Sequence, residues 1–289
     1  MIKKLTLKAN AKINIGLNIT GRRCDGYHEI ETLMHSVSIF DILEFTPSSN
    51  IRIVSDTPLN CGETANTVYK CIEKISAYTK AGKGMSVSIK KNIPIQAGMG
   101  GGSADGAAAL IAFNELYSLS LTKQELSEIG SSVGADIPFT VYGGCGFCTG
   151  VGEKIKHCEP LSDVNCLIVK PDIGIDTKTA YSYIDKYPSA KTDYTALLPE
   201  LYAEPHKSFK ENLHNAFEKY MFSTYVSTKE TKDLLYAHGA FAAGLTGSGS
   251  AFYGLFDDKL QMEKTVLSLN GKHGSVYSVQ LCSNSIIFI

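Results

Sequence analysis

The chain has 289 residues, a formal net charge of −1, 44% hydrophobic residues and 20% charged residues, which is the balance of an ordinary globular protein. The near-neutral charge argues against a protein dedicated to nucleic acid, and no apolar run approaches the length of a membrane span. The length allows two domains. Because the first residues alternate at once and lack the apolar core of a signal peptide, we expect a cytoplasmic protein.

Eight cysteines are scattered along the chain. In a reducing cytoplasm such cysteines usually serve as small buried hydrophobic residues. Cys145 and Cys148 form a C-x-x-C pair, but they lie in a strand-like run, where residues three apart face opposite sides. No second pair has the spacing of a zinc site. We therefore predict neither a metal site nor a redox site at this pair.

The first element is a run of alternating apolar and polar side chains over residues 5–19. This pattern predicts one long strand, or two strands joined by a bend. The polar face carries Lys12 and Asn14, two residues apart. It could be plain solvent-exposed surface, or it could be the floor of a polar site.

A turn signal at Asp25-Gly26 follows this strand. Tyr27 and His28 come next, and together they could stack on a flat ring and form hydrogen bonds to it. Such a pair is more often ordinary surface. Further strands are predicted over residues 32–45 and 51–54.

Helix signals lie on both sides of the central part of the chain. Asn66 can cap a first helix, whose apolar side chains keep helical spacing. Thr122 and Glu125 form a capping box that begins a second helix. Asp136 then precedes a proline, so it could simply cap a further short helix. That reading is the better one until a partner for the carboxylate is found.

A glycine-rich run lies between a predicted strand at 85–89 and a predicted helix at 107–116. It reads Pro94, Ile95, Gln96, Ala97, Gly98, Met99, Gly100, Gly101, Gly102, Ser103 and Ala104. We expect Ser103 to cap the helix and Asp105 to lie in its first turn. Glycines let backbone N–H groups approach a ligand, and a helix N-terminus attracts anions. The run is neither a P-loop nor a dinucleotide fingerprint, but its context favours a phosphate site over a mere packing turn.

The second half of the chain mixes short strands with helices. Its predicted elements are, in chain order, a strand pair at 140–156, a strand at 165–170, and helices at 208–222 and 224–238. A second glycine loop spans residues 244–251 and precedes a strand at 252–256. Because the strands and helices mix without strict βαβ repetition, we predict an α+β fold.

Three separated stretches form one pattern: Lys12-x-Asn14 on the first strand, residues 94–104 with Asp136 downstream, and residues 244–252. In this order and spacing they resemble the three signature motifs of the GHMP small-molecule kinases. Four further runs narrow the resemblance to the branch that phosphorylates the 2-hydroxyl of 4-diphosphocytidyl-2-C-methyl-D-erythritol in the non-mevalonate isoprenoid pathway. These runs are residues 11–14, 26–28, 134–138 and 171–181.

The resemblance implies two domains, residues 1–158 and 159–289, with the active site in the cleft between them. It implies ATP as phosphoryl donor together with Mg²⁺, and it makes residues 94–104 the ATP loop. Asp136 would accept the proton of the substrate hydroxyl, and Lys12 would stabilise the charge that develops. No residue is assigned as a metal ligand.

The resemblance also implies how the substrate is held. Asn14 would hold the substrate, Tyr27 and Tyr181 would stack on the two faces of the cytosine, and His28 would read its polar edge. Ala104 stands where many relatives carry a second hydroxyl. Any magnesium or phosphate contact by that hydroxyl is therefore absent here.

Two other readings stay open at this point. Another GHMP kinase, of the homoserine or mevalonate type, shares the three motifs, although Tyr27, His28 and Tyr181 favour a cytidine substrate. A non-catalytic RNA-binding protein belongs to a different class, and the near-neutral charge argues against it. We expect a small-molecule substrate, no nucleic-acid or membrane partner, and a monomer or weak homodimer.

Overall fold

The computed structural model describes residues 4–58, 61–161, 164–188, 192–196, 209, 212–269 and 271–289. The strands are β1 (Leu5–Arg22), β2 (His28–Ser48), β3 (Arg52–Ser55), β4 (Gly84–Lys90), β5 (Cys145–Thr149), β6 (Lys154–Cys158), β7 (Asn165–Lys170), β8 (Ala242–Leu245), β9 (Phe252–Phe256), β10 (Ser275–Cys282) and β11 (Ile286–Phe288). The helices are the 3₁₀-helix η1 (Glu63–Ala65), α1 (Thr67–Thr79), α2 (Gly101–Leu116), α3 (Lys123–Ser131), α4 (Ile137–Tyr142), α5 (Thr177–Lys186), α8 (Glu218–Thr224), α9 (Ser227–Ala237) and α10 (Lys259–Leu269).

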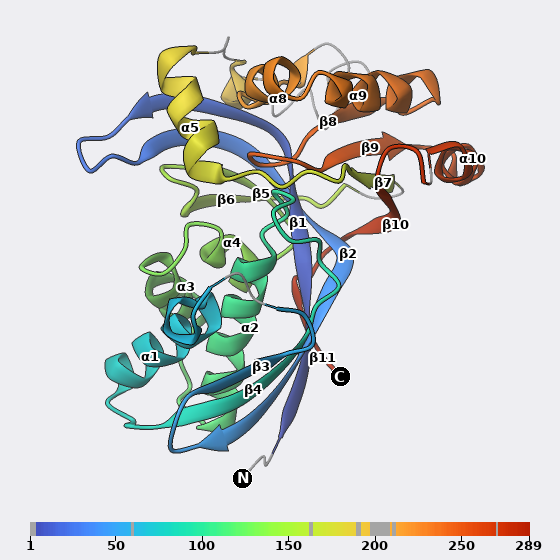
Figure 1. Ribbon diagram of the computed structural model, residues 1–289. Coiled ribbons are helices and arrows are strands. Elements are labelled where there is room, and N and C mark those ends of the chain that lie inside the picture. Colours follow the sequence, from blue (N-terminus) through green and yellow to red (C-terminus); the bar gives the residue numbers. More distant parts are fainter. Residues whose placement is uncertain are drawn as a thin grey trace.

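The long antiparallel pair β1 and β2 runs through the whole molecule (Figure 1). In the described residues, the sheet order along the main path is β11-β1-β2-β10-β7-β9-β8, with β4 and β5 also pairing with β2. Helices α1 to α4 cover one end of this pair, whereas α5, α8 and α9 cover the other (Figure 1). The α+β prediction and the two predicted long strands are confirmed.

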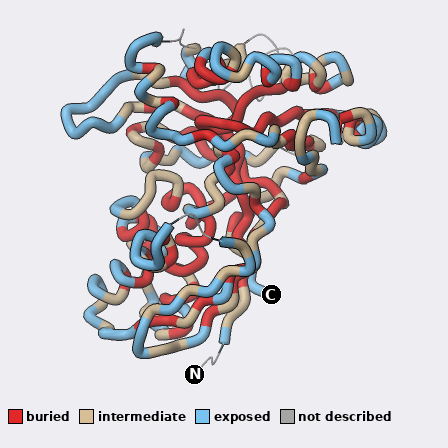
Figure 2. The backbone as a smooth tube through the Cα atoms, viewed as in Figure 1, coloured by how far each residue is buried: buried red, intermediate tan, exposed pale blue. Residues whose placement is uncertain are grey.

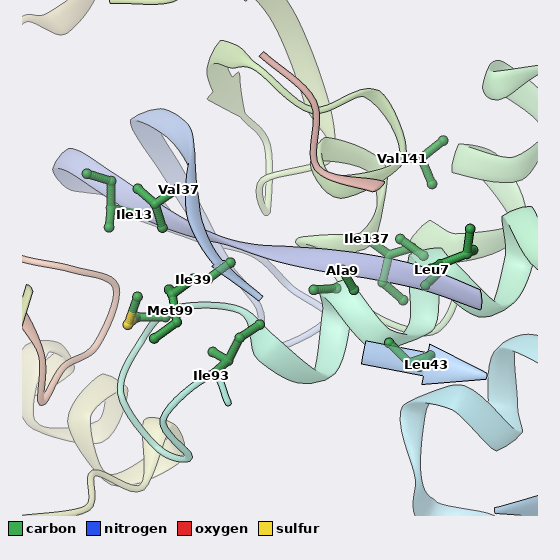
Figure 3. Packing of buried hydrophobic residues seen from close by; sticks show 14 of the residues in the cluster. Leu7, Ala9, Ile13, Val37, Ile39, Leu43, Ile93, Met99, Ile137 and Val141 are labelled. Atoms are coloured by element: carbon green, nitrogen blue, oxygen red, sulfur yellow. The ribbon is translucent and has the colours of Figure 1, made fainter. Parts of the chain in front are cut away.

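The core follows the buried face of these two strands, whose central parts are buried (Figure 2). One cluster packs α1 to α4 against β1, β2 and β4. Figure 3 shows Met99 of the glycine-rich run, and Ile93 immediately before the run, among the core side chains. The loop is therefore anchored in the core at two points. A second cluster joins Leu17 of β1 to the elements of the C-terminal half.

Two predicted helix starts are confirmed and one is wrong. The Asn66 side chain accepts the backbone N–H of Val68 at 2.8 Å and begins α1. The capping box at Thr122 begins α3. By contrast, Ser103 does not cap α2, and Asp105 lies beyond its first turn. The helix begins earlier because the residue before it is a glycine with a φ of 71°, a left-handed conformation that lets the chain turn directly into the helix.

One other predicted boundary is wrong, and one predicted helix is interrupted. The strand pair predicted over 140–156 begins only at Cys145, because α4 occupies the residues up to Tyr142. In the described part of the predicted helix at 208–222, residues 209 and 212 are helical, but the helix is interrupted and α8 starts at Glu218. In the interruption, Asn215 forms a parallel bridge to Leu17 on β1.

Asn215 explains why the helix cannot continue there. Its side-chain amide donates to the carbonyl oxygens of Leu245 and Gly247 at 2.8 and 3.0 Å. These tertiary hydrogen bonds hold the chain in a non-helical path.

The predicted domain boundary after residue 158 stays a prediction. None of the helices in the described part of the chain combines the length and the apolar character needed to cross a bilayer.

His35 on β2 should make the stability of the protein depend on pH. The side chain is fully buried, its Nδ1 lies 2.9 Å from the carbonyl oxygen of Ser36, and its Nε2 accepts the backbone N–H of Leu161 at 3.1 Å. Burial lowers the pKa of His35 below its ordinary value. The unfolded chain therefore binds a proton below about pH 6.5 that the folded chain excludes, so stability is lost as the pH falls below this value.

We predict that His35→Gln flattens this part of the pH dependence. Urea unfolding of wild type and variant at pH 5.5 and pH 7.5 measures the difference. His157→Gln, at an exposed position, is the matched control and should keep the wild-type dependence. An unchanged pH dependence in His35→Gln would contradict this account of the buried imidazole.

Candidate active site

Lys12 is the centre of the polar cluster on β1. Its Nζ lies 3.3 Å from Oδ2 of Asp136 and donates to Oδ1 of Asn14 at 2.6 Å and to the carbonyl oxygen of Gly98 at 3.1 Å. Lys12 and Asn14 are only 5% and 1% exposed. The polar face of the first strand is therefore the floor of a site and not ordinary surface. A buried ammonium requires such partners, because it has left its hydration shell.

Asn14 is held in place from several sides. Its side-chain amide donates to Oγ1 of Thr32 at 2.9 Å, which turns its oxygen toward Lys12. The pairing of β1 with β2 also shifts register on both sides of Lys12 and Asn14. Such irregularities bend a strand and redirect its side chains. The predicted role of Asn14 in holding the substrate stays a prediction.

Asp136 does not have the capping role that was the better reading of the sequence. It stands at the N-cap position of α4, yet its side chain makes no capping hydrogen bond. The carboxylate faces Lys12 instead. Its side chain is 28% exposed, so it is reachable from solvent, whereas the ammonium beside it is almost covered.

The glycine-rich loop lies over this pair. Gln96, Gly98 and Gly100 have positive φ values of 54°, 74° and 71°, so the chain turns sharply before it enters α2. Helix α2 is 16 residues long, and its N-terminus opens on the cavity, which Gly101 and Gly102 line. The unsatisfied N–H groups of a helix start attract anions.

A second glycine loop, after β8, closes on the first. Oγ1 of Thr246 donates to the carbonyl oxygen of Gly98 at 3.2 Å and accepts the backbone N–H of Asn14 at 3.0 Å. The backbone N–H of Ala251 also donates to the carbonyl oxygen of Ala97 at 3.2 Å. Sequence reasoning did not single out Thr246, because its position within the second glycine run was the only signal.

The far end of the cavity holds an aromatic pair. His28 stacks on Tyr181 with ring centroids 4.5 Å apart, and its Nε2 lies 2.7 Å from Oδ1 of Asp185. Tyr27 is 64% exposed. His28 thus lies against the ring of Tyr181, at the place where we expected the two tyrosines to face each other across a base.

Asp185 and Arg22 were missed from the sequence. Arg22 lies 3.2 Å from the second carboxylate oxygen of Asp185, so Asp185 links His28 to this arginine. A usable signal existed, because Asp185 follows Tyr181 at the i, i+4 spacing of one helix face. Burial raises the pKa of Tyr181 to about 12, and the negative charge of Asp136 adds to this shift.

One cavity of about 1180 Å³ joins these parts, from the glycine loop across Lys12 and Asp136 to His28 and Tyr181. Sites for a single small ligand are usually about 300–1,000 Å³. The cavity is therefore large enough for two reactants that meet at the Lys12–Asp136 pair.

Comparison with known proteins agrees with this geometry. Residues 66–144 match the GHMP kinases N terminal domain, and residues 197–275 match the GHMP kinases C terminal domain. A 4-diphosphocytidyl-2-C-methyl-D-erythritol kinase from Thermoanaerobacter pseudethanolicus is 36% identical over 287 residues, which cover 99% of this chain and 97% of that protein. The chain belongs to the 4-diphosphocytidyl-2-C-methyl-D-erythritol kinase family.

Solved structures support the same placement. A crystal structure of 4-(cytidine 5'-diphospho)-2C-methyl-D-erythritol kinase superposes with a TM-score of 0.78 at 28% identity and covers 96% of this kinase and 99% of that chain. Homoserine kinase from Cytophaga hutchinsonii superposes with a TM-score of 0.77 at 18% identity, covering 100% of this chain and 98% of that one. The second likeness shows a shared fold alone. The predicted GHMP-kinase fold is thus confirmed, and the protein is a kinase.

The close approach of the two glycine loops can be tested by stability. A Cβ at Gly98 would lie 2.1 Å from the carbonyl oxygen of Thr246, whereas a Cβ at Gly102 would meet only Oγ1 of Thr67, at 3.5 Å. We predict that Gly98→Ala lowers the free energy of unfolding by at least about 2 kcal/mol, since left-handed strain alone costs roughly 1–2 kcal/mol. Gly102→Ala, inside α2, should change it by less than about 1 kcal/mol. Urea unfolding checks both, and equal effects would contradict the tight loop contact.

Proposed function

We propose that this kinase transfers the γ-phosphoryl group of ATP to the 2-hydroxyl of 4-diphosphocytidyl-2-C-methyl-D-erythritol. The observation that carries the proposal is the Lys12–Asp136 pair, which lies between the glycine loop and the aromatic end of one continuous cavity. Relatives from Clostridium tetani and Thermoanaerobacter pseudethanolicus are named as kinases of this substrate. No feature of the described residues favours the homoserine, mevalonate or RNA-binding alternatives.

ATP would bind with its phosphates on the loop at residues 94–104. The backbone there has room for close approach, and α2 directs its N-terminal N–H groups and partial positive charge at the same place. Gly100 adds to the fit, because a Cβ there would lie 3.0 Å from the Cε of Lys12. A glycine thus keeps the loop against the catalytic lysine.

Mg²⁺ fits the site as a companion of ATP. No group of three or more His, Cys, Asp or Glu side chains among the described residues could hold a metal by itself. Mg²⁺ commonly uses only one or two carboxylates and takes its other ligands from phosphates and water. Because the carboxylate of Asp136 is assigned to the proton transfer, the phosphates of ATP and water would supply the ligands of the ion. Bound there, the ion would neutralise charge on the phosphates.

The chemistry asks the protein for positioning and charge stabilisation. Asp136 accepts the proton of the 2-hydroxyl as the oxygen of that hydroxyl forms its bond to the γ-phosphorus. The bond from the γ-phosphorus to the bridging oxygen breaks, and ADP leaves with the bonding electrons. Lys12 stabilises the negative charge on the transferring group, and its three neighbours hold its ammonium in place.

The cytidine would bind at the aromatic end of the cavity. Tyr181 and His28 supply ring surfaces, and Tyr27 lines the same cavity with its ring exposed. Binding of a base between Tyr27 and Tyr181 would require His28 to leave the face of Tyr181. Asp185 holds the imidazole in its present position.

We further propose that the enzyme acts in the cytoplasm as a monomer or weak homodimer, on a small-molecule substrate and without a nucleic-acid or membrane partner. The net charge of −1 favours no polyanion. Cys71, Cys148 and Cys166 are buried, which is the usual position of cysteines that serve as small hydrophobic residues. Burial also raises the pKa of the Cys148 thiol well above its usual range, so it stays protonated.

A substrate panel tests the proposal. ADP release should require 4-diphosphocytidyl-2-C-methyl-D-erythritol, and it should stay at background with homoserine or mevalonate. Efficient turnover of either alternative acceptor, with none of the cytidyl substrate, would overturn it.

The proposed proton transfer to Asp136 gives a sharper prediction. We expect Asp136→Asn to lower kcat by about 10²–10⁴-fold with little change in either KM, because it removes the proton acceptor. Lys12→Ala should also lower kcat more than it weakens binding. Asp258→Asn is the matched control, since Asp258 is a true capping residue that accepts the backbone N–H of Leu260 at 2.8 Å. Near-normal turnover by Asp136→Asn would remove Asp136 from the chemistry.

The aromatic end gives a separate prediction. Stacking on a base is worth roughly 1–3 kcal/mol per ring, so Tyr27→Ala and Tyr181→Ala should raise KM for the cytidyl substrate and leave KM for ATP almost unchanged. Tyr181→Phe keeps the ring and should be nearly silent. Tyr78→Ala, on an exposed face of α1, is the control. If a uridine analogue were used as well as the cytidyl substrate, the proposed reading of the cytosine edge by His28 would be refuted, whereas the stacking role of the two tyrosines is tested by their KM values.

A further inference from the structure

We propose that a buried ion cluster of Asp41, Lys91 and Asp105 positions the nucleotide loop. Lys91 Nζ is paired with Oδ2 of Asp41 and donates to Oδ2 of Asp105 at 2.8 Å. The three side chains are 0%, 8% and 6% exposed. This inference rests on the proposed role of the loop in binding ATP. None of the three residues was singled out from the sequence as a binding or catalytic residue.

The cluster joins the two ends of the loop to one strand. Oδ1 of Asp41, on β2, accepts the backbone N–H groups of Asn92 and Ile93 at 2.6 and 2.8 Å, immediately before the loop. Asp105 lies on α2, immediately after the loop. Lys91 connects the two carboxylates. The chain between Lys91 and Asp105 is therefore fixed at both ends through Asp41.

The loop needs to be fixed at both ends because its backbone adopts an unfavourable conformation. The segment between the two ends contains Gln96, a non-glycine residue at a φ of 54°, and two glycines with positive φ. Holding such a segment ready before ATP arrives lowers the ordering cost that binding must otherwise meet. The anchoring of Ile93 and Met99 in the core acts in the same direction.

Two members of the cluster also reach the cavity. Asp105 and Lys91 both line it, and Oδ1 of Asp105 has no hydrogen-bond partner among the described residues. Burial raises the pKa of Asp105, and the opposing charge of Lys91 lowers it. The cluster therefore borders the space in which the phosphates would lie.

Two variants separate a positioning role from a purely structural one. The uncharged triple variant Asp41→Asn/Lys91→Met/Asp105→Leu keeps an acceptor oxygen at position 41 and replaces the ion pairs by apolar contacts. Replacing a buried ion cluster by apolar residues is often neutral for stability. The milder Asp105→Asn keeps the shape of the side chain. Lys229→Met/Asp233→Leu, an exposed ion pair on α9, is the control.

Calorimetric titration with ATP and with the cytidyl substrate, and hydrogen exchange of the amides at 94–104, are measured on each variant. We expect a folded triple variant whose loop amides exchange faster, with Kd for ATP raised about tenfold if the binding-competent loop falls to about a tenth of the molecules. Kd for the cytidyl substrate should not change. Asp105→Asn should shift both loop readouts in the same direction by a smaller factor.

Unchanged loop exchange and ATP affinity in the folded triple variant would overturn the proposal. If the triple variant does not fold, Asp105→Asn decides by the same two readouts. This result can be told apart from failure of the proposed function. If the proposed function failed, wild type itself would bind no ATP. The exchange of the loop amides would still show whether the cluster holds the loop.

Discussion

The structure depends on one backbone carbonyl group, that of Gly98. Its oxygen accepts hydrogen bonds from Nζ of Lys12 at 3.1 Å and from Oγ1 of Thr246 at 3.2 Å. These two contacts bring together the first strand, the loop before α2 and the loop after β8, which are far apart in the sequence. Only a residue without a side chain fits there, because a Cβ would collide with the carbonyl oxygen of Thr246. The meeting of the two glycine loops is thus a steric requirement.

The buried ammonium of Lys12 follows from this meeting. A charge that is removed from water must be compensated by nearby acceptors, and the carbonyl of Gly98, the amide oxygen of Asn14 and the carboxylate of Asp136 provide them. The same three acceptors orient the ammonium toward the cavity. The stability of the fold and the placement of the proposed catalytic pair therefore rest on the same contacts.

Local signals predicted the parts of the fold that local forces decide. Alternation was enough for β1, and the caps at Asn66 and Thr122 located α1 and α3. The prediction failed where distant contacts override local preference. Asn215 breaks a helical pattern to bond carbonyl groups at the end of β8 and in the second glycine loop. Likewise, no pattern within either segment indicates that His28 stacks on Tyr181, because this contact joins residues far apart in the chain.

The most direct test of the account is a crystal structure of the kinase with ADP and 4-diphosphocytidyl-2-C-methyl-D-erythritol bound together. The quantity to measure is the distance from the carboxylate of Asp136 to the 2-hydroxyl oxygen of the substrate. The account predicts a direct hydrogen bond of about 2.6–3.2 Å, with the ADP phosphates on the loop at residues 94–104. A 2-hydroxyl that lies out of reach of Asp136, even through one water molecule, would contradict it.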